Sequence, residues 1–288
     1  MLANYLIGLR EGLEATLVVV ILVAYLVKSG RRELLRGVWS GVAVAVLVSL
    51  AFGALLTYGP RGLSFRAQEG LGGSLSIVAV AFVTWMVMWM ARSARSLSGD
   101  LKGAVDKAAA AGGLSVALVA LLAVGREGLE TALFLWAATQ AATGTTGSST
   151  LPLVGAALGI ASALLLGYLF YRGAVRINLG TFFTWTGAVL IVVAAGVLGY
   201  GVHDLQEAGI LPGLNSLAFD VSAAIPPGSW AGTLLKGTLN FTPATTWLQA
   251  LAWVAYVAVV MPLFFRVLRR RGRPAAPAAR PVPAGSAS

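Results

Sequence analysis

Apolar runs of about twenty residues recur along most of this 288-residue chain. A helix needs about 20 such residues to cross a hydrocarbon core of about 30 Å, so each run is long enough to span a bilayer. Only 11% of the residues are charged, less than half the usual share of a soluble domain. We therefore predict an all-α, multi-pass integral membrane protein of the plasma (cytoplasmic) membrane. Its seven transmembrane helices are expected near residues 4–27, 37–58, 70–90, 113–141, 151–171, 179–201 and 245–268.

The basic residues fall almost entirely on one side of these predicted spans. They follow the first, third, fifth and seventh spans, as Lys28, Arg31, Arg32, Arg36, Arg92, Arg95, Lys102, Lys107, Arg172, Arg176, Arg266, Arg269, Arg270, Arg271, Arg273 and Arg280. The opposite side has only Arg61, Arg66 and Lys236. By the positive-inside rule the N-terminus lies outside and the C-terminus in the cytoplasm. The net charge of +10 thus reflects membrane sidedness and does not indicate a nucleic-acid partner.

Residues 1–272 are predicted to form one permease domain, and residues 273–288 a disordered cytoplasmic tail rich in Pro, Ala and Ser. Residues 202–244 form the longest extracytoplasmic segment, and the last helix, 245–268, follows it. The stretch from Met1 to Leu9 has no charged side chain, so the first span is expected to stay as a membrane helix. The chain has no cysteine, which excludes disulfides, thiolate ligands and iron-sulfur clusters.

A charged five-residue motif occurs twice inside the predicted spans. The first copy is Arg10-Glu11-Gly12-Leu13-Glu14, and the second is Arg126-Glu127-Gly128-Leu129-Glu130. A second echo supports the repeat, because Gly37 and Gly41 open the second span as Gly155 and Gly159 open the fifth. Three crossings separate the copies and an odd number inverts direction. We therefore expect an inverted 3+3 repeat, of about residues 4–91 and 113–201, plus one extra helix.

Both motifs are expected at one depth, about 10 Å from the outer surface. Ionised side chains are costly in a bilayer, so they are expected to face the protein interior or an aqueous path. On a helix the Arg and both Glu of each copy share one face. One Arg cannot neutralise two Glu, so each copy keeps a surplus negative charge that a purely structural pin between helices would not need. The sequence therefore predicts a path for a hard cation, with Glu11, Glu14, Glu127 and Glu130 as metal ligands and Arg10 and Arg126 as charge-balancing groups. A soft copper site at Met86, Met88 and Met90 is disfavoured, because methionines in membrane helices mostly serve packing.

Paired Arg-Glu-x-x-Glu motifs in the first and fourth of seven spans resemble the oxidase-dependent iron permeases. These are the fungal high-affinity iron permeases and the bacterial Efe-type iron permeases. The resemblance covers residues 1 to about 270 and includes Glu69-Gly70 leading into the stretch 84–90, and the stretch from His203 to Gly209. It implies import of iron, Fe³⁺ or Fe²⁺, as the transported substrate, with no permanently bound cofactor. It also implies extracytoplasmic partners, namely a ferroxidase, or an iron-binding protein and a haem peroxidase.

The stretch just after the sixth span is a candidate external capture site. If this stretch is helical, His203 and Glu207 share a face at i, i+4, with Asp204 beside them, and Glu69 lies just outside the third span. The alternative is that these side chains cap or solvate an exposed loop.

Two other functions stay open. One is a permease for another divalent metal, such as Mn²⁺ or Pb²⁺, because oxygen ligands do not discriminate enough. The other is a non-transporting membrane subunit that docks extracytoplasmic partners. An enzyme is not expected, because the spans contain no His or Cys and no second cluster of metal ligands of hydrolase type.

Overall fold

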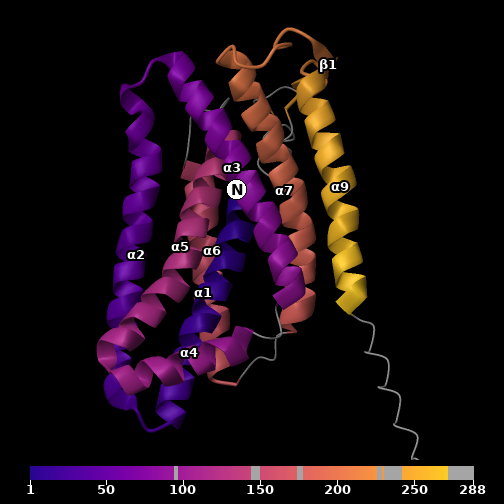
Figure 1. Cartoon of the computed structure of the whole chain (residues 1–288). Coiled ribbons are helices and arrows are strands. Elements are labelled where there is room, and N and C mark those ends of the chain that lie inside the picture. Colours follow the sequence, from indigo (N-terminus) through magenta and orange to yellow (C-terminus); the bar gives the residue numbers. More distant parts are fainter. Residues whose placement is uncertain (94–96, 144–149, 174–177, 226–228, 230–241, 272–288) are drawn as a thin grey trace, which may run out of the picture.

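The computed structural model describes residues 1–93, 97–143, 150–173, 178–225, 229 and 242–271. Nearly all of this part of the chain is helical, and its long helices lie side by side in a bundle (Figure 1). The helices are α1 (Leu2–Lys28), α2 (Leu35–Tyr58), α3 (Phe65–Ser93), α4 (Leu97–Ala111), α5 (Gly113–Thr143), α6 (Thr150–Tyr171), α7 (Leu179–Glu207) and α9 (Trp247–Arg271). Short 3₁₀ helices, Arg32–Leu34 and Gly59–Gly62, flank α2. Strands β1 (Leu217–Asp220) and β2 (Ala244–Thr246) pair antiparallel.

Five helices are long and apolar enough to cross a membrane. They are α2, α3, α6, α7 and α9, and each has a mean hydropathy of at least 2.0 over its most apolar stretch. Large apolar side chains such as Leu47, Leu50 and Leu251 are exposed on α2 and α9, and lipid rather than water is the solvent that suits them. Helices α1 and α5 are as long but carry an Arg and two Glu in their interior. The chain is thus an all-α, multi-pass membrane protein.

Helices from the two halves of the chain pair with one another. Helix α1 packs along α6, α2 along α5, and α3 along α7. Glycines permit the first two pairings, because a Cβ at Gly41 would overlap the Ala117 carbonyl oxygen and one at Gly159 would overlap the Tyr5 carbonyl oxygen. The outer helix α9 packs mainly on α7.

The two ends of the bundle differ. Helix α4 crosses the end at which α1 finishes, and β1 with β2 lies at the opposite end (Figure 1). Val105 of α4 is buried against α1 and α5, and Arg31 forms a 3.6 Å ion pair with Asp106. The connection between α3 and α5 is therefore a packed helix.

Two predicted helix ends were misplaced. Helix α3 begins at Phe65, so Glu69 lies within its first turns and not just outside the span. Helix α7 continues to Glu207 instead of ending near Gly201, and Gly209 at φ 74° follows its end. Both helices are longer because polar side chains at their ends find partners in the bundle, as described below. Most of the stretch 226–241 and the whole predicted tail 273–288 lie outside the described residues.

Replacing Gly41 by Ala should lower the free energy of unfolding by about 1–3 kcal/mol, because the α2 and α5 backbones would have to separate. Gly53→Ala on the same helix is the matched control, since its Cβ would sit 3.7 Å from the Ala132 Cβ, an ordinary contact. Thermal unfolding in detergent measures both variants. Equal melting temperatures would contradict the close α2–α5 contact.

Candidate functional site

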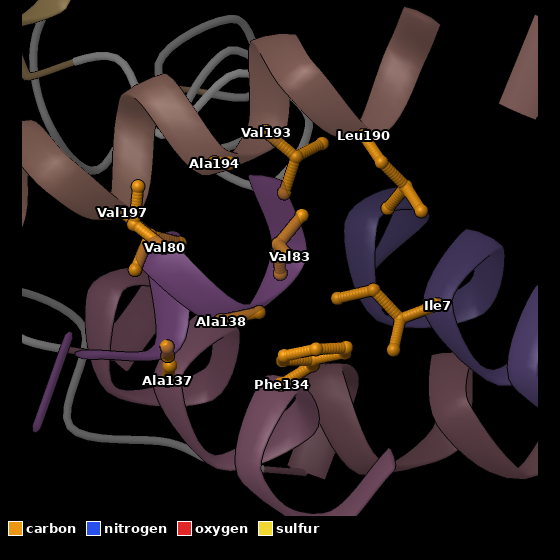
Figure 2. A pocket seen from close by; sticks show the side chains of 11 residues that line it. Ile7, Val80, Val83, Phe134, Ala137, Ala138, Leu190, Val193, Ala194 and Val197 are labelled. Atoms are coloured by element: carbon orange, nitrogen blue, oxygen red, sulfur yellow. The ribbon is translucent and has the colours of Figure 1, made fainter. Parts of the chain in front are cut away.

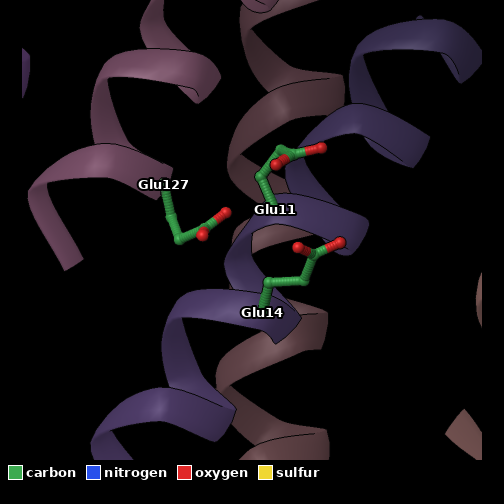
Figure 3. Close-up of side chains that lie close together, drawn as sticks. All are labelled: Glu11, Glu14 and Glu127. Atoms are coloured by element: carbon green, nitrogen blue, oxygen red, sulfur yellow. The ribbon is translucent and has the colours of Figure 1, made fainter. Parts of the chain in front are cut away.

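The two charged motifs meet inside the bundle. One carboxylate oxygen from each of Glu11, Glu14 and Glu127 lies within 4.8 Å of the other two. These side chains are almost fully buried, with exposed fractions of 0%, 4% and 7%. Figure 3 shows the Glu127 carboxyl group reaching from α5 toward the two glutamates of α1. The two motif copies therefore come together in the bundle, and their depth below the membrane surface stays a prediction.

Arg10 fills the space beside the two α1 glutamates. Its Nη1 donates to Glu11 Oε1 at 2.8 Å, and its Nη2 lies 3.2 Å from Glu14 Oε1, a contact without hydrogen-bond geometry. Nη1 also contacts the sulfur of Met86 on α3 at 3.0 Å. The side chain is 1% exposed, so this ion pair is screened little by solvent.

Arg126, in the second copy, is placed differently. Its Nε donates to Glu130 Oε1 at 2.9 Å and lies 3.8 Å from Glu127 Oε1. Its guanidinium lies over the Trp89 ring, 4.6 Å from the ring centre, and the side chain is 36% exposed. Glu130 pairs with this arginine and does not belong to the close group of three carboxylates. The two copies share a sequence but not an environment.

Several buried acceptor oxygens of the motifs have no hydrogen-bond partner among the described residues. They are Glu11 Oε2, Glu14 Oε1, Glu127 Oε2 and Glu130 Oε2. A buried acceptor left without a partner costs about 1–3 kcal/mol, and more when it is charged. Four carboxylates against two guanidiniums leave a surplus of negative charge, so this arrangement suits a cation with a preference for oxygen ligands.

The candidate capture residues gather where α3 begins and α7 ends. Asp204 is 3% exposed, and a Cβ at Gly72 of α3 would lie 3.2 Å from its Oδ2. Glu69 and the Tyr200 hydroxyl are within hydrogen-bonding reach of Asp204. His203 Nε2 lies 3.4 Å from Glu207 Oε1, on the shared face expected for i, i+4 residues, and both side chains are 35% exposed. The structure thus places Asp204 inside the bundle and the His203–Glu207 pair at its edge.

Sequence reasoning missed Tyr200, Gln206 and the contact made by Met86. Tyr200 lies one turn before Asp204 on α7, and that i, i+4 spacing was the available signal. Gln206 is buried and accepts from Thr246 Oγ1 at 2.9 Å while donating to the Pro212 carbonyl at 2.8 Å. It therefore ties α7 to the base of α9, which explains why α7 continues past the predicted end. Nothing in the sequence indicated the Met86 contact.

An apolar cavity lies between the group of Glu69, His203, Asp204 and Glu207 and the close group of Glu11, Glu14 and Glu127. Its lining comes from α1, α3, α5 and α7, and Figure 2 shows Ile7, Val83, Phe134 and Leu190 around it. On α1 the lining residue Ile7 lies about one turn before Glu11, and on α5 the lining residues lie about two to three turns after Glu127. On α3 they lie between Glu69 and Met86, and on α7 they precede Asp204. A hydrated ion moving between the two polar groups would meet this apolar stretch.

Comparisons with known proteins identify relatives over nearly the whole chain. The model of a family described as the iron permease FTR1 family matches residues 1–271. The chain is 36% identical over 270 residues to the ferrous iron permease EfeU of Escherichia coli O6:H1 (strain CFT073), which covers 91% of this chain and 96% of that one. It is 35% identical over 285 residues to EfeU of Yersinia pestis, with 98% and 99% covered. No solved structure matches the chain.

The two arginines should differ in what they contribute to stability. Arg10→Leu leaves two fully buried glutamates without a compensating charge and should lower the free energy of unfolding by about 3–5 kcal/mol. Arg126→Leu should cost less, because that side chain is partly exposed and its partners are less enclosed. Thermal unfolding in detergent compares the pair. An equal loss would show that the two copies are energetically equivalent, contrary to the structure.

Proposed function

The chain belongs to the iron permease FTR1 family, and from this premise we propose that it imports iron across the plasma membrane along a glutamate-lined path. The observation that carries the proposal is the close group of Glu11, Glu14 and Glu127, drawn from both motif copies. Buried carboxylates that lie close together repel one another, and their unpartnered oxygens can be stabilised by a bound cation. Glu130 is the fourth proposed ligand, and in this structure it is paired with Arg126.

The proposed architecture has seven spans, an inverted repeat of α1–α3 and α5–α7, and α9 as the added helix. The exchanged pairing of α1 with α6 and α2 with α5 is what a two-fold axis in the membrane plane would produce. The N-terminus is proposed to face outward and the C-terminus the cytoplasm. The basic residues near α4 and at the end of α9 then lie on the inner side.

Iron is proposed to travel from the outer group to the central one. His203 and Glu207 are accessible and would meet the ion first, and Glu69 and Asp204 would draw it inward. The ion would then cross the apolar cavity to reach Glu11, Glu14 and Glu127. The relatives' names specify ferrous iron, so we propose Fe²⁺ as the species transported.

The extracytoplasmic partners are proposed to be an iron-binding protein and a haem peroxidase, or a ferroxidase. Their place would be the end of the bundle that carries β1 and β2 (Figure 1). The outer group of Glu69, His203, Asp204 and Glu207 lies where α3 begins and α7 ends, so a partner there could deliver iron directly.

Uptake of labelled iron by the purified protein in liposomes, with and without a pH gradient, tests the function. Glu11→Gln, Glu14→Gln and Glu127→Gln should each slow uptake by about 10- to 100-fold, since one charge-assisted contact contributes about 1.5–3 kcal/mol. Glu33→Gln, at an exposed position beside α2, is the matched control and should leave uptake unchanged.

Two further arms separate the alternatives. If the chain is a non-transporting subunit, the unaltered protein will show no uptake. If the motifs only hold helices together, Glu14→Asp will be tolerated, whereas a metal-ligand site will lose activity on this change. Equal uptake of Mn²⁺ or Pb²⁺ in competition with iron would instead favour a general divalent-metal permease.

The outer residues should affect affinity more than turnover. His203→Gln and Glu207→Gln should raise KM for iron several-fold with little change in kcat, because they act before the central site. Rates measured over a range of iron concentrations decide this. A loss of kcat at unchanged KM would place these residues in the transport step itself.

A further inference from the structure

Met86 sits among the charged groups of the central site, although its residue type favours packing. Its side chain is fully buried on α3, and its sulfur lies 3.0 Å from Arg10 Nη1. The same nitrogen donates to Glu11 Oε1 at 2.8 Å. The Met86 sulfur and the Glu11 Oε1 atom therefore both lie within hydrogen-bonding distance of the same guanidinium nitrogen.

We propose that the Met86 thioether is a ligand for the transported ion, and that it makes the central site prefer a borderline metal such as Fe²⁺ over Mg²⁺ or Ca²⁺. The inference rests on the proposed function and deepens it, because it names a residue outside both motifs that sets ion selectivity. Carboxylates alone suit Mg²⁺, Ca²⁺ and Mn²⁺ at least as well as iron. Thioether sulfur is soft and binds hard cations poorly, so a single sulfur shifts the preference.

The geometry supports this role because Arg10 Nη1 occupies the place that a metal cation would take. An ion at that position would meet Glu11 Oε1 and the Met86 sulfur, and Glu14 and Glu127 lie close enough to complete an oxygen-rich set. Glu11 Oε2 and Glu127 Oε2 are buried and have no hydrogen-bond partner among the described residues. They are the free ligands that such an ion would use.

Binding requires the Arg10 guanidinium to withdraw, and the second motif copy shows where such a group can go. Arg126 lies over the Trp89 ring and is partly exposed, while still paired with Glu130. The Phe183 ring centre lies 5.9 Å from the Arg10 guanidinium carbon, so the proposal has the guanidinium move toward that ring when the ion binds. One cation then replaces another, and the glutamates stay compensated throughout.

Met90 provides the matched control. It lies one turn further along α3, is 3% exposed, and packs in the apolar core with Val87 and Phe264. Met86→Leu and Met90→Leu both remove one buried sulfur at nearly constant volume, a change that cores tolerate well. Only the first removes a sulfur that contacts the motif.

X-ray absorption at the iron edge, on Fe²⁺ bound to the purified protein in thiol-free buffer, tests the ligand directly. The chain has no cysteine, so any sulfur bound to iron must come from a methionine. The unaltered protein and Met90→Leu should show a sulfur shell, and Met86→Leu should show oxygen and nitrogen only. In liposome uptake, Met86→Leu should weaken competition by Cd²⁺ about 10-fold and strengthen competition by Mg²⁺ and Ca²⁺, while Met90→Leu should change neither.

An iron spectrum of the unaltered protein without sulfur would overturn the proposal, and this measurement does not depend on any variant folding. Competition profiles that are the same for Met86→Leu and Met90→Leu would overturn it as well. Failure of the proposed function looks different, because the unaltered protein would then take up no iron at all.

Discussion

The fold depends on the cost of holding charge away from water. Arg10, Glu11 and Glu14 are almost fully buried, in a helix that otherwise presents apolar surface. None of them is stable there alone, so each must contact an opposite charge. Arg10 meets this requirement within α1 by pairing with Glu11 and Glu14, and Arg126 pairs in the same way with Glu127 and Glu130 of α5. The two motif-bearing helices then bring three of these carboxyl groups together inside the bundle. The other helices surround this contact and keep lipid from it.

Small residues make that contact possible. A carboxylate reaches only a few ångströms from its backbone, so α1 and α5 must approach closely, each supported by a neighbour. Gly159 lets α6 lie against α1, and Gly41 lets α2 lie against α5. Gly12 and Gly128, inside the motifs, face Ala163 of α6 and Ser49 of α2. The glycine of each motif thus serves helix packing, while its charged residues face the other way, into the site.

The two motif copies have different environments, and the difference suits a transport protein. Arg10 is enclosed between carboxylates and a thioether, whereas Arg126 rests on an aromatic ring and is partly exposed. A site with one arginine inserted and one withdrawn offers two arrangements of the same groups. The apolar cavity beside it, lined by Ile7 and Phe134 among others, separates this site from the outer carboxylates. In the proposed transport path, these two polar groups with the apolar stretch between them would hold an ion at either place without an open channel.

The amino-acid sequence by itself determined the helical membrane fold, the positions of the long helices, the duplicated motif and the shared face of Arg10, Glu11 and Glu14. These features follow from composition and from the spacing of residues along one helix, and both can be obtained directly from the sequence. Only the tertiary structure decided that Glu127 joins the α1 glutamates while Glu130 stays with Arg126, and that Met86 reaches Arg10. Such contacts depend on the rotation and tilt of each helix against its neighbours. A helix that is apolar on every side has no sequence pattern that specifies its rotation or its tilt.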